Sequence, residues 1–165
     1  MKKETRLYNV FFPIWFLLLY PLSWIIALPV NFAVDLLVLW LCCRRWGLPV
    51  REIWRRDIWL CWIFGFLGDL TGCSLLLAVN FIQNNWWQNN IVANLSWQPF
   101  ESVWAVLMIL AAMLLASVCI YLLDRFVVFR RRERKLAHRM ALVFAVATTP
   151  VTLLIPTAWL YANAL

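Results

Sequence analysis

Two aspartates lie inside long apolar segments of this sequence, where an ionisable side chain needs a reason. Asp69 lies about twelve residues into the apolar run that begins at Ile58, close to the middle of a bilayer at about 1.5 Å of rise per residue. Asp35 lies about nine residues before Arg44, roughly 13 Å from the boundary that this arginine marks. A carboxylate at the centre of a spanning helix costs roughly 2.5–3.5 kcal/mol on insertion scales, so both side chains should face a bundle interior or a wet cavity.

Two asparagines share helical faces with these aspartates. Asn31 precedes Asp35 by four residues, a spacing that puts both side chains on one face of a helix. Asn80 follows Asp69 by eleven residues and returns near the same face at about 3.6 residues per turn. We therefore expect the ion-binding or polar-network residues to be Asp69, Asp35, Asn31 and Asn80.

Three interpretations of the aspartate pair remain open. In the first, the carboxylates bind a cation or relay protons, as intramembrane carboxylates do in pumps and transporters. In the second, each aspartate is a packing residue that is hydrogen-bonded to Asn31, Thr71, Ser74 or a tyrosine or tryptophan donor. In the third, an aspartate pairs with a basic group of a partner subunit, because no lysine or arginine of this chain lies at that depth.

The sequence does not favour an enzyme. An intramembrane aspartyl protease would use Asp35 and Asp69 as a dyad that shares one proton, but their expected depths differ by several ångströms. Nucleophilic catalysis needs a base within hydrogen-bond reach, and the single histidine, His138, lies at the edge of the apolar segments. No catalytic residue is predicted.

Glycines and prolines mark where helices should approach one another or bend. Gly65 precedes Asp69 by four residues and shares its face, and Gly68 and Gly72 form the small-xxx-small pattern that lets helix backbones approach closely. Pro150 and Pro156 interrupt the last apolar segment, where each removes a backbone donor. We expect helix packing at the glycines and a helix kink at the prolines.

The composition points to a membrane. Of 165 residues, 65% are hydrophobic and 14% are charged, whereas a soluble domain carries about 25% charged residues. A chain of roughly 150 residues buries only about two-thirds of its surface, so a soluble monomer is excluded. The cysteines show no metal-ligand spacing, and we expect free thiols, no metal and no cofactor; they are Cys42, Cys43, Cys61, Cys73 and Cys119.

The positive charge is grouped in three short segments, at residues 2–6, 44–56 and 125–139. Basic residues gather on the cytoplasmic side of short loops, so these segments mark the inside of a cell membrane. They should contact anionic lipid headgroups, and no nucleic-acid partner is expected despite the net charge of +7. The N-terminus and loops 44–57 and 124–139 are then cytoplasmic, and loop 82–102 and the C-terminus lie outside.

Hydropathy and segment length predict an all-α, polytopic integral membrane bundle that forms a single domain over residues 1–165. A spanning helix needs about 20 apolar residues. We expect four full transmembrane helices, at about residues 22–43, 58–81, 103–123 and 140–161. Pro13, Pro21 and Pro29 break the first apolar block, so residues 10–20 should form a short re-entrant or interfacial helix.

The fragment YLLDRFVVFRRR, residues 121–132, is faintly similar to the helix-end motif of small four-span flippase-like proteins that move polyprenyl-linked sugars. In that family two spans follow the motif, whereas one apolar segment follows it here. Because the resemblance is confined to this fragment, no family is assigned and no site residue is carried over.

Together these features favour an oligomeric channel or transporter subunit that conducts a cation or a proton past its intramembrane carboxylates. Four helices seldom enclose a path alone, so we expect a homo-oligomer, formed through the face of Gly68 and Gly72, or a membrane partner subunit. The alternative is a non-catalytic component or accessory subunit of a larger transport, secretion or membrane-acting effector complex.

Overall fold

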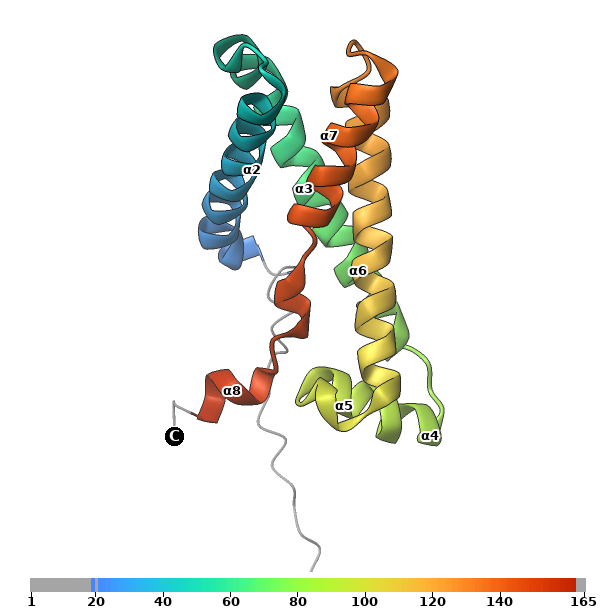
Figure 1. Ribbon diagram of the computed structural model, residues 1–165. Coiled ribbons are helices and arrows are strands. Elements are labelled where there is room, and N and C mark those ends of the chain that lie inside the picture. The colour runs from blue at the N-terminus through green and yellow to red at the C-terminus, as the bar shows by residue number, and fades with distance from the viewer. Residues whose placement is uncertain (1–18, 20, 163–165) are drawn as a thin grey trace, which may run out of the picture.

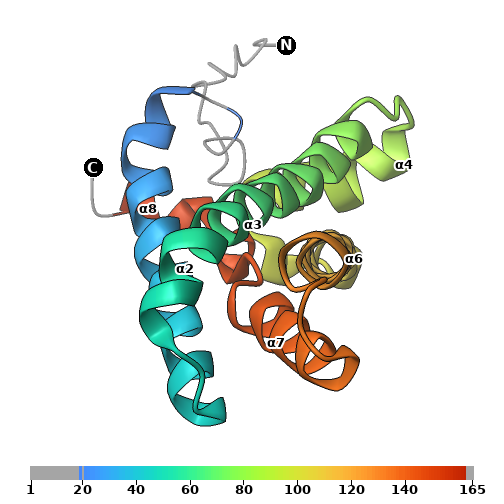
Figure 2. The same cartoon turned by 90° about the horizontal axis from the view of Figure 1, so that it is seen from above.

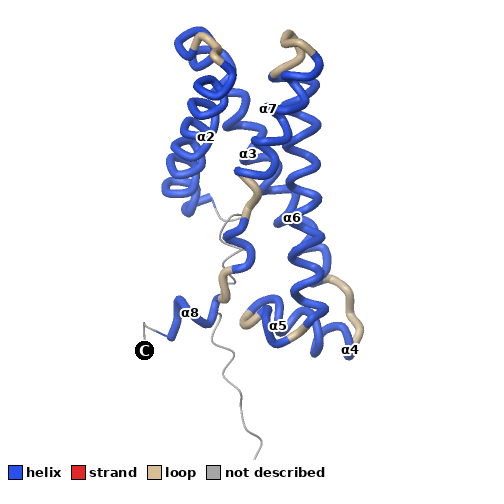
Figure 3. The backbone as a smooth tube through the Cα atoms, viewed as in Figure 1, coloured by secondary structure: helices blue, strands red, loops and turns tan. Residues whose placement is uncertain are grey.

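The computed structural model describes residue 19 and residues 21–162 and shows an all-α bundle in that part of the chain (Figure 1 and Figure 3). Four of its helices are long and apolar enough to cross a membrane, which confirms the predicted helical membrane bundle. The candidate spans cover Pro21–Trp46, Arg55–Asn80, Val103–Val128 and Arg134–Leu154. The short helix predicted at residues 10–20 falls on residues of which only Leu19 is described.

Four long helices form the bundle: α2 (Trp24–Trp46), α3 (Val50–Asn80), α6 (Val103–Leu123) and α7 (Arg134–Ala147). A short 3₁₀ turn, η1 (Pro21–Ser23), leads into α2, and a π-helical turn, η4 (Asp124–Val128), continues α6. Helix α6 begins and ends where the predicted span 103–123 does.

The loop predicted at residues 44–57 is much shorter in the structure. Helix α2 continues to Trp46 and α3 already begins at Val50, so the basic residues between them are mostly helical. Gly47 ends α2 in the left-handed conformation, at φ 62°, and its N–H donates to the Cys43 carbonyl. Glycine adopts this conformation without steric cost, which makes it the usual helix stop.

The fourth span begins and ends earlier than the predicted range 140–161. Helix α7 starts at Arg134, because the long basic side chains of its first turns can reach past the apolar region. It stops at Ala147, and the chain then continues as a short 3₁₀ helix, η5 (Val151–Leu154), and as α8 (Thr157–Ala162). The prolines therefore break this helix and do not merely kink it.

The turn between α2 and α3 and the turn between η4 and α7, with the arginines that flank them, lie at one end of the bundle, which we call the basic end (Figure 1). The link 82–102 and α8 lie at the opposite end. The link folds into four short helical pieces: α4 (Asn85–Trp87), η2 (Gln88–Val92), α5 (Ala93–Ser96) and η3 (Pro99–Glu101). The Ala158 N–H donates to the Trp97 carbonyl at 3.1 Å and ties α8 to this link.

Helix α3 is the central element and lies between α2 on one side and α6 on the other (Figure 2). Its 31 residues would extend about 46 Å, which exceeds the roughly 30 Å of a hydrocarbon core, and α3 crosses the bundle obliquely. Helix α6 meets α3 with a stripe of small and branched residues: Ala105, Ile109, Ala112, Ala116 and Ile120.

The glycine pair packs inside this chain, not against another copy. A methyl group at Gly68 would lie 2.9 Å from Ile120 Cδ1 and 3.2 Å from the Ala116 carbonyl oxygen. A methyl group at Gly72 would lie 3.1 Å from the Ala112 carbonyl oxygen. The predicted close approach is therefore present, and α6 of the same chain covers the face through which we expect an oligomer to form; the oligomer itself stays a prediction.

Candidate functional site

A polar group of side chains joins α2 to α3 in the middle of the bundle. The Asn31 amide donates from Nδ2 to Oδ2 of Asp69 at 2.9 Å. One turn along α2, the Asp35 carboxylate packs onto Gly65 of α3, where Oδ2 lies 3.2 Å from the place of an added Cβ. Because Gly65 lacks a side chain, the carboxylate can approach the backbone of α3 this closely.

The two carboxylates are nearly removed from solvent and incompletely hydrogen-bonded. Asp35 is 3% exposed and Asp69 is 7% exposed. Within the part of the chain that the structure describes, Oδ2 of Asp35 and Oδ1 of Asp69 have no hydrogen-bond partner. A buried polar atom without a partner is costly, and the two carboxylates are close enough to interact electrostatically.

A cavity of about 290 Å³ opens beside these side chains. Helices α2 and α3 contribute its acidic and amide groups, and the break after α7 closes the other side. Its lining comprises Val30, Asn31, Val34, Asp35, Gly65, Asp69 and the six residues 147–152. The cavity is therefore bounded by carboxylates on one side and by threonines and an interrupted helix on the other.

The break in α7 is held in place by hydroxyl groups. Thr149 Oγ1 donates to the Ala145 carbonyl at 2.6 Å and lies 2.8 Å from Ser117 Oγ of α6. Thr148 Oγ1 donates to the Phe144 carbonyl at 2.8 Å. Pro150 has no N–H, so the helix ends here and these hydroxyls satisfy part of the freed backbone.

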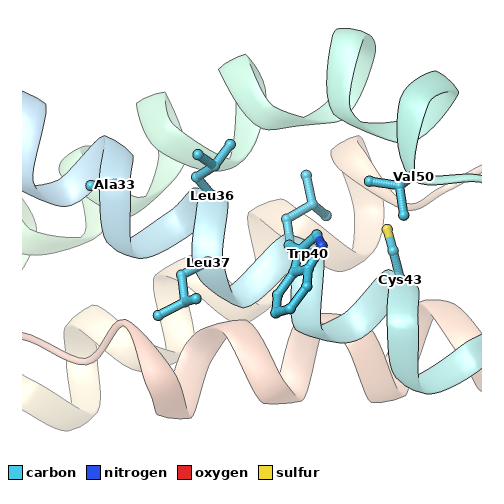
Figure 4. A pocket seen from close by; sticks show the side chains of 7 residues that line it. Ala33, Leu36, Leu37, Trp40, Cys43 and Val50 are labelled. Atoms are coloured by element: carbon cyan, nitrogen blue, oxygen red, sulfur yellow. The ribbon is translucent and has the colours of Figure 1, made fainter.

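A larger groove, of about 620 Å³, lies along α2 and reaches the start of α3 (Figure 4). Its lining is apolar apart from the Cys43 thiol and the Trp40 ring nitrogen, and it comprises Ala33, Leu36, Leu37, Leu39, Trp40, Cys43 and Val50. This groove therefore offers no charged group, unlike the smaller cavity at the carboxylates.

The structure brings most of the predicted polar residues together. Asn31, Asp35 and Asp69 meet, and Gly65 and Pro150 line the same cavity. Of the other four predicted residues, Gly68 and Gly72 pack against α6, and Asn80 and Pro156 lie elsewhere.

Asn80 ends α3 far from the cavity, where its Nδ2 donates to the Leu76 carbonyl and its own carbonyl accepts from Gln88 Nε2. Pro156 is buried just before α8 and is not among the residues that line the cavity.

Two further buried aspartates were not predicted. Asp57 is 4% exposed and Asp124 is completely buried. Both stand next to arginines in the sequence, a context that is typical of a solvated boundary. For Asp124 the signal was available, because it continues the Ala112, Ala116, Ile120 spacing of four residues that marks the buried face of α6.

The described part of the chain contains no group of three His, Cys, Asp or Glu side chains that could hold a metal ion. All five cysteines are free thiols. The chain matches no protein-family model, and comparisons with curated proteins and with solved structures find no significant match.

Proposed function

We propose that this protein is a membrane transport subunit in which Asp35 and Asp69 bind a proton or a small monovalent cation during passage through the bundle. The observation that carries the proposal is the cavity in which two buried carboxylates from different helices each keep an oxygen without a hydrogen-bond partner among the described residues. Intramembrane carboxylates that face a bundle interior mark ion paths and proton relays by default.

Charge compensation supports a cationic substrate. Two carboxylates in a low-dielectric interior need a proton or a cation nearby, since an uncompensated buried charge is costly. No lysine or arginine occurs between Arg56 and Arg125, so the described part of α3 and α6 supplies no positive side chain at the depth of Asp69. Asn31 donates one hydrogen bond to Asp69, which orients this carboxylate without neutralising it.

The size and lining of the cavity favour a small substrate. A volume of about 290 Å³ accommodates several water molecules at about 30 Å³ each, or a partly hydrated ion. Interrupted helices in transporters expose backbone carbonyls to a coupling ion near the membrane centre. In this proposal the break at residues 148–150 serves the same purpose, since it lines the cavity opposite the carboxylates.

The orientation and assembly state belong to the same proposal. We expect the basic end to face the cytoplasm of a cell membrane and to contact anionic lipid headgroups, because the segments 44–56 and 125–139 carry most of the chain's arginines. Self-association or a membrane partner would complete the path, since four helices seldom enclose one alone. An accessory role in a larger complex is the alternative.

The test is ion flux into liposomes that contain the purified full-length protein. Imposed gradients of protons, sodium and potassium are compared one at a time, with wild type beside Asp35→Asn and with empty liposomes as the background. We expect wild type to dissipate at least one gradient, and Asp35→Asn to reduce that flux by about 10²-fold, the contribution of a group that must accept and release a proton.

Glu101→Gln is the matched control, because it makes the same chemical change at an exposed carboxylate near the opposite end of the bundle. This variant should conduct like wild type. Wild-type liposomes that dissipate none of the three gradients faster than empty ones would contradict the transport proposal and favour the accessory role.

A further inference from the structure

Asp124 is the most deeply buried carboxylate among the described residues, and the cavity site does not use it. It lies where α6 passes into the π-helical turn η4, it is 0% exposed, and neither of its carboxylate oxygens has a hydrogen-bond partner among the described residues. Short π-helical turns inside α-helices are frequent at functional sites. A carboxylate retained at this cost in stability calls for a role.

The register between α6 and α3 places Asp124 beside the cavity site. Gly72 packs at Ala112, and Gly68 packs at Ala116 and Ile120, so the two helices run antiparallel. One further turn along each helix brings Asp124 next to the segment of α3 that contains Cys61 and Gly65.

Electrostatics agree with this register. Asp124 interacts with Asp35, which itself packs onto Gly65. Carboxylates from α2, α3 and α6 therefore converge on the middle of α3.

The neighbouring arginine does not compensate this charge. Arg125 bonds through Nη1 to Tyr121 Oη and to His138 Nδ1, and its guanidinium lies 5.5 Å from the centre of the Phe126 ring. The two ion pairs of the described residues both involve Asp57, not Asp124.

Few other titratable groups face Asp124. They are Asp35 from α2 and the Cys61 thiol of α3. From α7, the titratable side chains Arg134, Lys135, His138 and Arg139 are exposed.

A second polar cavity, of about 270 Å³, lies at the basic end, two turns before Gly65 on α3. Its lining includes Arg56, Asp57, Arg131 and Arg132. Asp57 is 4% exposed, and its Oδ2 lies 3.5 Å from Arg132 Nη2. Between Asp57 and Gly65 the same face of α3 carries Cys61, whose side chain is buried.

We propose that Asp124 relays protons between the membrane cavity at Asp35 and Asp69 and the arginine-lined cavity at Asp57. This inference rests on the proposed transport function and names the route through the half of the bundle toward the basic end. In each transfer, one O–H bond breaks at a carboxyl group and one forms at the next carboxylate through a bridging water molecule. Protons that enter at one cavity leave at the other, and no other reactant is consumed.

The experiment compares proton flux in liposomes for wild type, Asp124→Asn, Asp35→Asn and the control Glu101→Gln. Asparagine has nearly the shape of aspartate but cannot carry a proton between neighbours. We expect Asp124→Asn to lower proton flux by about 10²-fold, as we expect of Asp35→Asn. The control Glu101→Gln should conduct protons at the wild-type rate.

The outcomes separate this inference from the transport proposal. Proton flux that falls in Asp35→Asn but stays at the wild-type rate in Asp124→Asn would overturn the relay and keep the transport function. Flux of sodium or potassium without proton flux would also overturn the relay and keep the transport function. Wild-type liposomes without any flux would overturn both proposals together.

A second readout guards against a purely structural effect. We expect Asp124→Asn to keep or raise the melting temperature in detergent, since it removes an unpartnered buried carboxylate. Infrared difference spectra of wild type between two pH values should contain a carboxyl C=O band that Asp124→Asn removes. A wild-type spectrum without that band would assign Asp124 a structural role. So would the loss of both fold and flux in Asp124→Asn and in Asp124→Glu.

Discussion

Helix α3 uses glycine in opposite ways at its contact with α6 and at its contact with α2. Toward α6, Gly68 and Gly72 bring the α3 backbone against the carbonyls of Ala112 and Ala116. Toward α2, Gly65 makes room for a charged group, the Asp35 carboxylate. The same residue type therefore builds a tight apolar contact on one face and admits a buried polar group on the other.

This difference separates scaffold from site. In a bilayer the hydrophobic effect does not drive helices together, so association depends on close packing of small residues and on interhelical hydrogen bonds. The α3–α6 contact supplies the first and the α2–α3 contact supplies the second, through Asn31 and Asp69. We expect substitutions on the α6 face to change stability and substitutions on the α2 face to change transport.

The largest effect on stability should come from Gly68→Ala. The added methyl group would meet Ile120 and the Ala116 carbonyl, and a backbone atom cannot move aside without shifting α6. We expect the free energy of unfolding to fall by about 1–3 kcal/mol, the usual cost of overpacking. Denaturant titration in detergent measures it, and Gly72→Ala should behave alike. Wild-type stability in both variants would show that α3 and α6 do not pack this closely.

Alanine at Gly65 should lower the free energy of unfolding less than alanine at Gly68 does, but should reduce ion flux more. The added methyl group would lie 3.2 Å from Oδ2 of Asp35, the end of a side chain that can rotate away. Alanine also favours a helix over glycine by about 0.5–1 kcal/mol, which offsets the contact. We expect unchanged unfolding and a clear loss of flux in liposomes, because Asp35 is displaced. A Gly65→Ala variant that is as destabilised as Gly68→Ala would erase the contrast between the two faces.

The smallest effect should follow from Asn31→Ala, which removes the amide that bonds to Asp69 at 2.9 Å. Hydrogen bonds between membrane helices contribute about 0.6 kcal/mol on average, so the free energy of unfolding should fall by about that amount. The measurement is again denaturant titration, and Asn80→Ala, which makes the same change outside the cavity, is the variant for comparison. A loss of several kcal/mol would mean that the Asn31–Asp69 hydrogen bond holds α2 in the bundle. That result would favour the interpretation in which the aspartates are packing residues.

The membrane class and the number of spans could be predicted from the sequence because hydropathy and helix length are local properties. Helix α6 matches its predicted range, since Ser102 and Asp124 bound an uninterrupted apolar run. The fourth span begins earlier than predicted, because basic side chains at Arg134 and Arg139 do not end a helix that they can extend beyond.

The site could be predicted only in part. The polar positions Asp35, Asp69 and Asn31 followed from their depth and spacing, whereas their meeting depends on the register of α2 against α3. The burial of Asp124 depends on how α6 is rotated about its axis. The adjacent Arg125 instead indicates a position that faces solvent. The Gly68–Gly72 pattern predicted a close helix contact but could not name the partner helix.

The most direct test of the central claim measures flux and unfolding on the same preparation of Asp69→Asn. The asparagine oxygen can still accept the hydrogen bond from Asn31, so packing should be kept while the exchangeable charge is removed. We predict a loss of flux of about 10²-fold and a free energy of unfolding that stays within about 1 kcal/mol of wild type. Wild-type flux, or a loss of flux matched by a loss of folded protein, would contradict the assignment of these carboxylates to transport.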